Sequence, residues 1–513
     1  MQVIGDIARL NAKRYPDKVA LIMENESLTH KQVNQQANQI ANGLIFLGVK
    51  PGDRVAILAF NCIEFPIINF AVAKCGAMLV PVNFRYKKKE LAYVINNSEP
   101  KVLFFGPEFL SLVEEAKAEF TSSIHLVAIS KKPLDKALTL TKLMEGRSTA
   151  DPPVKVDPNS PCSVMYTSGT TGFPKGVLFP HAANMAIFTG MVMEGDLRHE
   201  DVTLVCLPLF HNGGLNATLQ PTLLMGGTVI ITGKGFDPDK ILDTVERYGV
   251  TMTMWVPTQL AMLINHPGSK KYNVSTLNKI WYGSSPISPT VLEGSMDLFK
   301  AGFYQWYGQT ETGMVSVLRP EDHKERSQCT GREMFNADLR VVDEEGNNTP
   351  VGKVGEIICA QVPLGMIGYY KMDEANKRVI RDDWIHTADL ARAEGDGYFT
   401  IVDRLTDMII SGAENIYPKE IEDVISSHPG VREVTVFGIP DEVYGEAVCA
   451  VVVRKEGHQL DQEAIINFCA SKLAGYKKPK KVEFMEDLPK NPSGKVTKNV
   501  LRDPYWAGRK KRI

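Results

Sequence analysis

Short apolar runs alternate with helical patterns along most of this chain, and that alternation limits the fold more than any other feature. Between residues 29 and 47 apolar side chains recur at helical spacing, and Thr29 with Gln32 has the pattern of a capping box. A proline–glycine pair then precedes an apolar run at residues 55–60, which predicts a buried strand. Short buried strands that alternate with helices are typical of a parallel sheet.

The alternation predicts two such sheets. It is interrupted over residues 131–161, where Asp-Pro pairs and little periodicity indicate an irregular connection, and it then resumes. Asp237 followed by Pro238 has the N-cap and N1 pattern of a helix start. The expected strands are residues 55–60, 77–82 and 102–105 in the first sheet and residues 203–207, 228–232, 251–256 and 279–282 in the second.

Beyond residue 318 the pattern changes to hairpins. A Glu-Gly-Asn-Asn turn separates apolar runs at residues 339–342 and 354–359, which predicts a small barrel or another β-rich subdomain. After Asp403 come a strand, a helix opened by Pro418, two strands, a helix and a lysine-rich end, as in a small α+β domain. The expected fold class is α/β with a β-barrel: a large N-terminal domain of two α/β subdomains and a small β subdomain, then a small α+β C-terminal domain. The C-terminal strands are expected at residues 408–411, 434–437 and 447–453, and the helix at residues 462–473.

Composition excludes some classes of function. The 513 residues carry 58 basic and 60 acidic side chains, and the formal charge of −2 gives no support to nucleic-acid binding. No apolar run approaches the roughly 18 residues of a membrane-spanning helix, and residues 1–9 lack the basic and apolar stretches of a signal peptide. We therefore expect a cytoplasmic protein with no transmembrane segment. Its eight cysteines lack C-x-x-C spacing and are expected to be reduced core thiols.

Residues 166–177 read YTSGTTGFPKGV and have the composition of a phosphate cradle. Glycines let backbone N–H groups approach anionic oxygens, hydroxyls add donors, and Lys175 adds a positive charge. The spacing is not that of a Walker A loop, because Phe-Pro-Lys-Gly follows the second glycine, and no G-x-G-x-x-G pattern occurs. The loop therefore predicts a polyphosphate site outside those two classes.

This loop resembles the signature loop of the adenylate-forming enzymes, the family of acyl-CoA synthetases, luciferases and peptide-synthetase adenylation domains. Five further stretches resemble motifs of that family in the same order, so the resemblance covers nearly the whole chain. It implies an N-terminal AMP-binding domain over residues 1–403, a hinge at residues 404–407 and a mobile C-terminal domain over residues 408–513. The stretches are LPLFHNGG at residues 207–214, WYGQTETG at 306–313, HTADLA at 386–391, YFTIVDRLTDMIISGAENIYPKEIE at 398–422 and PKNPSGKVTK at 489–498.

The resemblance implies roles for the residues at matching positions. Lys495 would reach the α-phosphate and the substrate carboxylate, where a cation stabilises the negative charge that spreads over the phosphate oxygens. Glu311 would hold Mg²⁺ with Thr167 beside it, and Asp389 would accept the two ribose hydroxyls. The implied catalytic residues are Lys495, Glu311 and His211, and the implied ATP- and AMP-binding residues are Thr167, Ser168, Gly169, Thr170, Thr171, Gly172, Lys175, Gly283, Ser284, Trp306, Tyr307, Gly308, Gln309, Thr310, Asp389 and Arg404.

The implied reaction has two halves and uses ATP, Mg²⁺ and coenzyme A. A carboxylate and ATP give an acyl-adenylate and pyrophosphate, and the thiol of coenzyme A then displaces AMP. The family rotates its small domain between the halves about a hinge residue that is Lys or Asp in many relatives, whereas this chain has Thr406. It also has Ala413 where relatives usually have a second glycine near the thiol path. The implied coenzyme A residues are Gly412, Ala413, Tyr476 and Lys477.

The expected substrate is a medium-chain fatty acid or an aromatic acid. Long-chain relatives can carry a tryptophan gate where Leu215 stands, and acetate-specific relatives have a tryptophan where Gly308 lies. Coenzyme A is the favoured acceptor because no carrier segment follows Ile513. A separate carrier protein as acceptor, luciferase-type oxygenation and a nucleotide sensor without ligase activity stay open, as do a monomer and a homodimer. The acyl pocket implied by the resemblance includes Gly213, Gly214, Leu215, Trp255, Val256 and Met314 and is mostly apolar.

Overall fold

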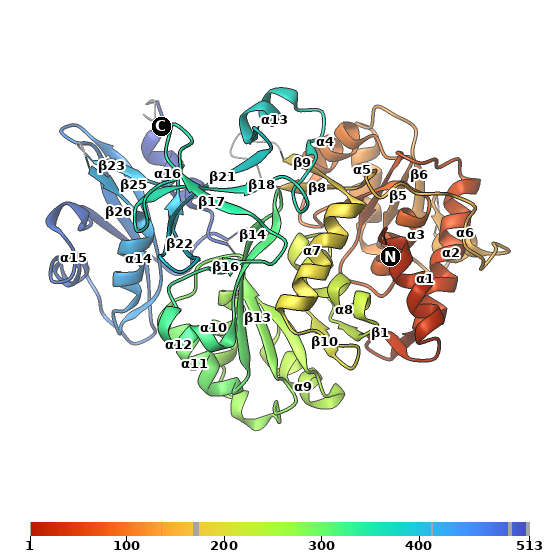
Figure 1. The fold of residues 1–513 in the computed structure, drawn as a ribbon, viewed down its shortest axis with the longest axis horizontal. Coiled ribbons are helices and arrows are strands. Elements are labelled where there is room, and N and C mark those ends of the chain that lie inside the picture. The colour runs from red at the N-terminus through yellow and green to blue at the C-terminus, as the bar shows by residue number, and fades with distance from the viewer. Residues whose placement is uncertain (1, 135, 168–173, 412–413, 491–494, 509–513) are drawn as a thin grey trace.

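Three β-sheets organise the chain in the computed structural model, which describes residues 2–134, 136–167, 174–411, 414–490 and 495–508 (Figure 1). The first sheet and its helices lie at one end of the molecule, the C-terminal sheet lies at the other end, and strands of the second sheet run between them (Figure 1). This arrangement confirms the predicted α/β class with a large N-terminal domain and a smaller C-terminal domain.

The first sheet has a parallel centre that contains the three predicted strands. β3 pairs in parallel with β4 on one side and β5 on the other. Val55 and Ile57 of β3 belong to one apolar cluster, while Ala56 and Leu58 belong to another, so helices cover both faces. The sheet runs in the order β19 (Gly368–Tyr369), β9 (Lys175–Pro180), β8 (Pro161–Thr167), β4 (Met78–Pro81), β3 (Arg54–Leu58), β5 (Val102–Phe105), β6 (His125–Ala128) and β7 (Leu138–Thr139).

The predicted helix starts are present with their predicted caps. Thr29 precedes α2 (His30–Phe46); its Oγ1 accepts the backbone N–H of Gln32 at 3.3 Å, and the Gln32 side chain accepts the N–H of Thr29 at 2.8 Å. Asp237 caps α9 (Pro238–Tyr248) by accepting the backbone N–H of Asp239 at 3.1 Å. The connection at residues 131–161 is mostly irregular, as expected, but it contains β7 and the short helix α6 (Leu140–Met144).

The second sheet joins the predicted strands to segments from other parts of the chain. β10, β11, β12 and β13 correspond to the four predicted strands. β1 pairs in parallel with β11, so an N-terminal hairpin that the apolar pattern did not predict completes this sheet. The sheet includes β1 (Val19–Met23), β2 (Glu26–Thr29), β10 (Val202–Val205), β11 (Thr228–Ile231), β12 (Met252–Trp255), β13 (Lys279–Gly283) and β14 (Gly302–Gln309).

The β-rich region expected after residue 318 extends this second sheet through antiparallel pairs. β15 pairs with β14, and the described strand pairs continue as an open path to β17. The predicted hairpin is β17 with β18, which pair from Leu339 with Cys359 to Val342 with Glu356. The strands of this region are β15 (Gly313–Leu318), β16 (Gly331–Glu333), β17 (Leu339–Val342), β18 (Val354–Ala360), β20 (Ile380–Arg381), β21 (Trp384–Ala393) and β22 (Tyr398–Arg404).

The third sheet lies in the C-terminal part of the chain. β25 and β26 form a long antiparallel pair, longer than the predicted runs, and β27 joins β26 in parallel. Helices α14 and α15 place Ile421, Ile425 and Ile465 in one apolar cluster with residues of these strands. The elements are β23 (Ile409–Ser411), β24 (Glu414–Ile416), α14 (Pro418–Ser426), β25 (Val431–Asp441), β26 (Gly445–Arg454), α15 (Gln462–Ala470), β27 (Lys481–Met485) and α16 (Lys498–Arg502).

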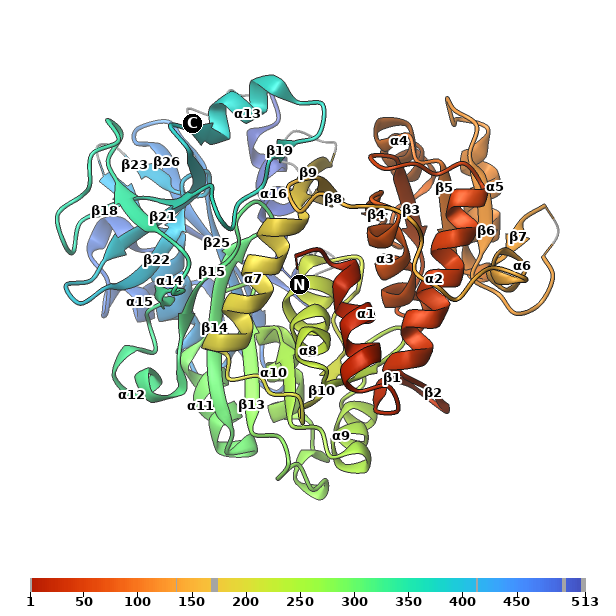
Figure 2. The same cartoon turned by 45° about the vertical axis from the view of Figure 1, so that its right-hand side comes forward.

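Helices fill the layers between the sheets. Figure 2 shows α7 running beside β14 and β15 on one side and α8 on the other. The α7 residues Ile187, Phe188 and Met191 are buried in the largest apolar cluster. The remaining helices are α1 (Gly5–Arg14), α3 (Glu64–Lys74), α4 (Lys88–Ser98), α5 (Leu110–Lys117), α7 (His181–Glu194), α8 (Gln220–Met225), α10 (Pro257–Asn265), α11 (Pro289–Phe299), α12 (His323–Arg326) and α13 (Asp373–Val379).

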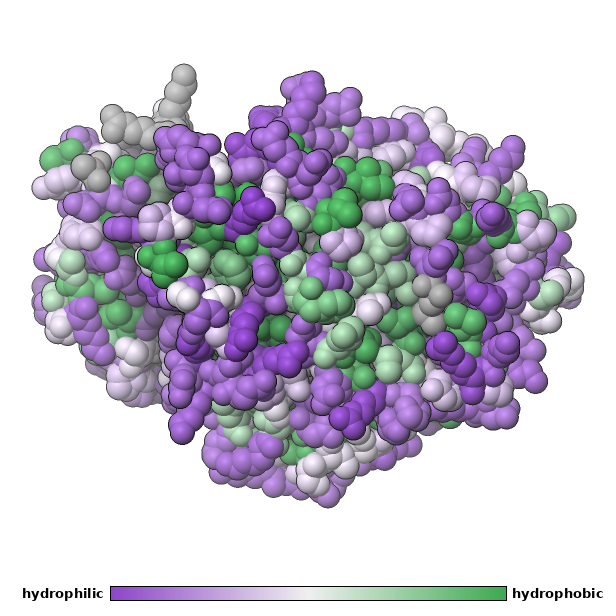
Figure 3. All heavy atoms as spheres, in the orientation of Figure 1, coloured by the Kyte–Doolittle hydropathy of each residue, from purple (hydrophilic) through white to green (hydrophobic). Residues whose placement is uncertain are grey.

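The surface and the thiols agree with an ordinary globular chain. Hydrophilic residues cover most of the face in Figure 3, with smaller apolar areas among them. Within the described ranges, no helix combines the length and the apolar character that crossing a membrane requires. All eight cysteines are free thiols; seven are buried, as expected, and Cys62 is half-buried.

A buried ion pair supports the second sheet, and its removal should be costly. Lys279 donates to both carboxylate oxygens of Asp201, at 2.7 and 3.0 Å, and both side chains are nearly inaccessible. We expect Lys279→Met to lower the free energy of unfolding by about 3 to 5 kcal/mol, because it leaves a buried carboxylate without its cation. Denaturant unfolding measures this. Lys300→Met, which breaks an exposed pair with Asp297, should change stability by less than about 1 kcal/mol; equal losses in the two variants would contradict the prediction.

Candidate active site

A buried carboxylate lies where β14, β21 and β22 meet. Asp389 of β21 accepts the Tyr307 hydroxyl at 2.9 Å and the Gln309 amide at 2.7 Å through Oδ2, and Arg404 Nε at 3.1 Å through Oδ1. Asp389 and Arg404 are paired across β21 and β22, and this pairing places the Arg404 side chain beside the carboxylate. Four of the residues expected to bind adenosine therefore form one hydrogen-bonded group, although they span almost a hundred positions.

The surroundings of Tyr307 in this group keep its hydroxyl protonated. Burial, and then the negative charge of Asp389, raise the pKa of the Tyr307 hydroxyl well above its usual range. Tyr307 is therefore a hydrogen-bond donor at every physiological pH. Its ring stays available as an apolar surface beside a fixed charge, which suits the predicted position against adenine.

Two expected nucleotide-binding glycines are required by the sheet itself. A Cβ on Gly308 would lie 1.9 Å from the carbonyl oxygen of Gly313, where β14 and β15 shift register. A Cβ on Gly283 would lie 2.2 Å from the carbonyl oxygen of Trp306. Ser284 follows with a φ of 70°, the left-handed conformation. Close strand packing thus explains Gly308 and Gly283 without a ligand.

Trp306 lies in the core. Its side chain is almost fully buried, and its ring centre is 5.0 Å from that of Trp281. Thr310 lies in the turn between β14 and β15, next to Glu311. Within the motif at residues 306–313, the Trp306 side chain therefore packs in the core, whereas the Tyr307 and Gln309 side chains contact Asp389.

A second group forms around Glu311. The hydroxyl of Tyr369 donates to Glu311 Oε1 at 2.8 Å, and Lys175 Nζ lies 5.0 Å from the centre of the Tyr369 ring. Antiparallel pairing of β19 with β9 places Tyr369 opposite Val177, beside Lys175. Thr167 lies across from Lys175 in the β8–β9 pair. The fold thus joins the expected phosphate-loop lysine to the expected metal carboxylate through a tyrosine.

Sequence reasoning missed Tyr369, which lies outside every motif quoted for the family resemblance. It is nearly buried, and its backbone is held by Asn376, whose side chain accepts the Tyr369 N–H at 2.6 Å and donates to its carbonyl at 3.0 Å. A tyrosine after a glycine in a two-residue strand has no periodicity to distinguish it from any other core aromatic. Only the tertiary pairing of β19 with β9 reveals its position.

The Glu311 group fits Mg²⁺. Glu311 Oε2 accepts no hydrogen bond from the described residues, and the Thr167 hydroxyl lies at the end of β8, just before the glycine-rich loop. Among the described residues no group of three or more His, Cys, Asp or Glu side chains could hold a metal. Mg²⁺ in phosphate sites is typically held by one or two protein groups together with phosphate oxygens and water, and one carboxylate with one hydroxyl matches that pattern.

Several expected residues lie outside the described part of the chain. These are Ser168, Gly169, Thr170, Thr171 and Gly172 of the phosphate loop and Gly412 and Ala413 of the coenzyme A set. The other two coenzyme A residues lie on the C-terminal domain: Tyr476 is exposed, and Lys477 forms an ion pair of 2.7 Å with Glu420.

Lys495 reaches the N-terminal domain from the C-terminal one. Burial and then the positive charge of Arg404 lower the pKa of its ammonium group to about 8, whereas Asp389 and Glu311 oppose this shift. Lys495 is therefore within electrostatic reach of both groups described above. The pKa of His211 is lowered to about 4, first by burial and then by the charge of Lys495.

His211 is consequently neutral at physiological pH, with a defined tautomer. Its Nδ1 accepts the backbone N–H of Gly213 at 3.2 Å, so the ring proton is on Nε2. A neutral ring that can donate from Nε2 suits a position beside a bound carboxylate.

The residues expected to form the acyl pocket do not all face the same side of the second sheet. Leu215, Val256 and Met314 belong to the largest apolar cluster, whereas Trp255 packs on the opposite face, 5.1 Å from the Phe299 ring centre. Successive strand residues alternate faces, so Trp255 and Val256 cannot both line one pocket through their side chains. We therefore leave Trp255 out of the pocket.

The two glycines after His211 differ. Both lie in a π-helix, Gly213–Leu219. A Cβ on Gly214 would lie 2.4 Å from the carbonyl oxygen of Pro208, so close backbone packing requires this glycine, whereas a Cβ on Gly213 would make ordinary contacts. Backbone packing therefore explains Gly214, whereas it does not require a glycine at position 213.

The expected hinge is a turn held from both sides. The N–H of Leu405 donates to the carbonyl of Ala388 at 2.9 Å, which fixes its start on β21. Arg502 donates to the Thr406 carbonyl at 3.4 Å and pairs with Asp407 at 3.3 Å from the C-terminal side. Asp403 also crosses the junction, because it accepts the backbone N–H of Lys419 at 2.9 Å.

Comparisons with known proteins identify the family. The family model described as "AMP-binding enzyme" matches residues 8–370, and "AMP-binding enzyme C-terminal domain" matches residues 420–495. The chain therefore belongs to the AMP-binding enzymes, which confirms the resemblance seen in its motifs.

Relatives align over nearly the full length. The chain is 37% identical to a feruloyl-CoA synthase of an Amycolatopsis species, over 98% of this chain and 99% of that protein. It is 35% identical to a fatty acid–[acyl-carrier-protein] ligase of Streptomyces coeruleorubidus, over 100% and 98%. Similar solved structures include an anthranilate CoA ligase in complex with anthranoyl-AMP (TM-score 0.92, 25% identity, 98% of this chain and 97% of that one) and ATP-bound MatB from Rhodopseudomonas palustris (TM-score 0.90, 31%, 98% and 99%).

Tyr369 should orient Glu311 for metal–nucleotide binding. We expect Tyr369→Phe to weaken ATP binding in the presence of Mg²⁺ about tenfold, since it removes one hydrogen bond to a charged acceptor. Without Mg²⁺ the weakening should be smaller. Titration calorimetry with and without Mg²⁺ measures both values.

Tyr370→Phe is the matched control. Tyr370 is the next residue, packs in a different apolar cluster, and its hydroxyl makes no hydrogen bond to the described residues. It should bind ATP as the unchanged protein does. An equal effect of Mg²⁺ on the two variants would refute the positioning role of Tyr369.

Proposed function

We propose that this chain is an ATP-dependent acid–thiol ligase. It adenylates a carboxylic acid of the medium-chain fatty or aromatic class, transfers the acyl group to coenzyme A, and releases AMP and pyrophosphate. The observation that carries the proposal is the position of Lys495, a cation of the C-terminal domain within the field of Asp389, Arg404 and Glu311. The coenzyme A ligases among its relatives support the same reaction class.

In the first half-reaction the side chains bring two anions together. Asp389 and Tyr307 hold the adenosine, while Lys175 and Glu311 lie on the phosphate side. The carboxylate enters beside the neutral ring of His211, which can donate from Nε2 without adding a charge that competes with Lys495. Lys495 then offsets the negative charge that spreads over the phosphate as the carboxylate attacks. Bound Mg²⁺ supplies further charge neutralisation on the phosphates.

The second half-reaction needs Lys495 to leave. A thiol and Lys495 cannot approach the acyl-adenylate from the same side, so the C-terminal domain rotates about residues 404–407. In the present arrangement the ion pair between Arg502 and Asp407 links this turn to the C-terminal domain. Tyr476 and Lys477 on the C-terminal domain are the residues proposed for coenzyme A.

A carrier protein is the second candidate acceptor. The similarity to a fatty acid–[acyl-carrier-protein] ligase over the whole chain favours it, since both acceptors present the same thiol. Thioester formation with coenzyme A, compared with thioester formation with a phosphopantetheinylated carrier protein, separates the two.

The protonation state of Lys495 should appear in the pH profile. Since Lys495 is charged only below its pKa of about 8, we expect kcat/KM for pyrophosphate release to be level near neutral pH and to fall about tenfold per unit above about pH 8. Lys495→Arg should remove this alkaline limb, because a guanidinium stays protonated. Lys495→Ala should lower the rate about 100- to 1000-fold. Full adenylation by Lys495→Ala would sink the proposed mechanism, and absence of acid-dependent pyrophosphate release in the unchanged protein would favour a nucleotide sensor.

The hinge can be tested apart from the chemistry. Thr406→Pro fixes φ in the turn that should rotate, so we expect thioester formation to slow at least about tenfold while pyrophosphate release stays within about twofold. Single-turnover measurements of the two products give both rates. Equal losses of both activities would refute the assignment of residues 404–407 as the hinge.

A further inference from the structure

The segment that carries Asp389 is a bulge in β21. Ile358 of β18 pairs with His386. The next pair along the two strands joins Glu356 to Leu390, and the register shifts between these pairs. One residue of β18 therefore lies opposite three residues of β21, which are Thr387, Ala388 and Asp389. Bulges redirect side chains next to active sites, so the direction of the Asp389 carboxylate depends on what holds this bulge.

Ala388, at the centre of the bulge, has a strained backbone. Its φ of 57° lies in the left-handed region, where a Cβ atom crowds the following carbonyl oxygen. A residue other than glycine stays in this region only where the surrounding contacts impose it. The partners of the Ala388 N–H and carbonyl groups therefore determine the shape of the bulge.

A carboxylate of β18 binds the Ala388 N–H. Glu356 Oε1 accepts this N–H at 2.8 Å, although Ala388 lies in the part of β21 that is outside the strand ladder. A hydrogen bond to an ionised acceptor is shorter and stronger than one between neutral groups. Glu356 is therefore well suited to hold a peptide group in an unfavourable conformation.

The other carboxylate oxygen of Glu356 is held by the residue that precedes the bulge. Oε2 lies 2.7 Å from His386 Nδ1 and 3.6 Å from a guanidinium nitrogen of Arg381. The side chains of Glu356 and His386 are only 18% and 14% exposed. One carboxylate thus fixes both the start of the bulge and the residue at its centre.

Further hydrogen bonds complete the bulge around Asp389. The Thr387 hydroxyl donates to the Ile357 carbonyl at 2.5 Å and accepts the Asp389 N–H at 3.1 Å. The N–H of Leu405 donates to the Ala388 carbonyl at 2.9 Å. Both backbone polar groups of Ala388 are thus bonded, which fixes the direction in which the Asp389 side chain leaves the backbone.

We propose that Glu356 is a positioning residue for the ribose of ATP. It imposes the left-handed conformation of Ala388, and this conformation directs the Asp389 carboxylate toward the two ribose hydroxyls. Glu356 acts through Ala388 and does not touch the nucleotide. This inference rests on the ribose-binding role that Asp389 has in the proposed function.

Two nucleotides test the positioning role. ATP offers both ribose hydroxyls to Asp389, whereas 2′,3′-dideoxy-ATP offers neither. Titration calorimetry in the presence of Mg²⁺ gives the Kd of each. We expect the unchanged protein to bind ATP at least about tenfold more tightly, because a site that pairs the hydroxyls of its substrate rejects an analogue without them. Glu356→Leu should reduce this preference to within about threefold, mainly by weakening the binding of ATP.

Two further variants distinguish positioning from general stability. Glu356→Gln keeps an acceptor oxygen for the Ala388 N–H and should retain a preference of at least about fivefold. Glycine adopts a left-handed φ without steric cost, so Ala388→Gly added to Glu356→Leu should restore a preference of at least about fivefold. If Glu356→Leu does not fold, Glu356→Asp takes its place, because its shorter side chain cannot bond Ala388 and His386 together.

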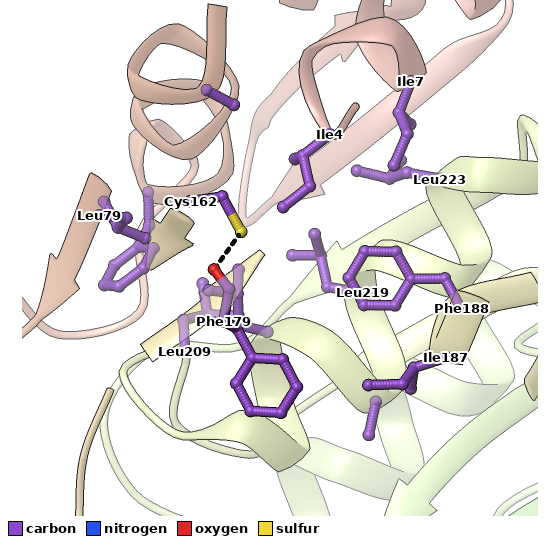
Figure 4. Close-up of a cluster of buried hydrophobic side chains, with 14 of the residues drawn as sticks. Ile4, Ile7, Leu79, Cys162, Phe179, Ile187, Phe188, Leu209, Leu219 and Leu223 are labelled. Atoms are coloured by element: carbon purple, nitrogen blue, oxygen red, sulfur yellow. Dashed lines mark hydrogen bonds between the residues drawn. The ribbon is translucent and has the colours of Figure 1, made fainter. Parts of the chain in front are cut away.

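Glu194→Leu is the matched control. Glu194 Oε1 accepts the N–H of Phe335 at 3.0 Å, Oε2 pairs with Arg319, and the side chain is 11% exposed, so its bonding and burial resemble those of Glu356. It is the last residue of α7, a helix that Figure 4 shows anchored in the apolar core by Ile187 and Phe188. Its partners lie outside the bulge, so the preference for ATP should not change. Thermal unfolding of every variant distinguishes lost recognition from lost folding.

The outcomes separate this inference from the ligase reaction. A folded Glu356→Leu variant, or Glu356→Asp in its place, that keeps the original preference would overturn the positioning role. Equal Kd values for the two nucleotides in the unchanged protein, no rescue by glycine, or an equal loss in Glu194→Leu would do the same. These binding measurements need no acid. Pyrophosphate release by the unchanged protein with octanoic and cinnamic acids tests the ligase, and its absence together with a preference for ATP would overturn the ligase but not the role of Glu356.

Discussion

The buried carboxylate of Asp389 is the constraint on which the site depends. A charge removed from water is tolerated only with several hydrogen-bond donors around it, and here Tyr307, Gln309 and Arg404 provide them. These donors come from β14 and β22, so satisfying one carboxylate fixes the relative positions of three strands. Arg404 is also the last residue of β22, and the turn to the C-terminal domain begins there. The same contact therefore sets where the C-terminal domain leaves the sheet.

That carboxylate also explains how a lysine can enter a site that already holds an arginine. Burial, and then the positive charge of Arg404, lower the pKa of Lys495, but Asp389 and Glu311 act in the opposite direction. The balance leaves Lys495 charged at neutral pH, whereas burial, and then the charge of Lys495, lower the pKa of His211 and keep it neutral. In the proposed reaction, a domain rotation would remove one cation and leave the Asp389–Arg404 pair in place, so the adenosine side need not be rebuilt between the half-reactions.

Several residues that a motif assigns to a ligand are required by packing. A Cβ atom on Gly308 or Gly214 would collide with a backbone carbonyl oxygen, so both positions require glycine. Trp306 lies in the core against Trp281. Conversely, Tyr369 lies in no motif, yet its hydroxyl donates to Glu311, the carboxylate expected to hold Mg²⁺. A motif therefore marks the segment that forms a site, while the tertiary contacts decide which of its side chains face the ligand.

The sequence by itself determined what depends on near neighbours: the capping box at Thr29, the parallel strands of both sheets, the β-rich region and the small C-terminal domain, and, through the family resemblance, the segments that form the site. Local hydrogen bonds and the periodicity of apolar residues act within a few positions, so they can be read along the chain. It did not determine that β1 would join β11, that Trp255 would face away from Met314, or that Tyr369 would bridge Lys175 and Glu311. Those outcomes depend on which sheet edge a strand joins and which face of it meets the site, and only long-range packing decides that.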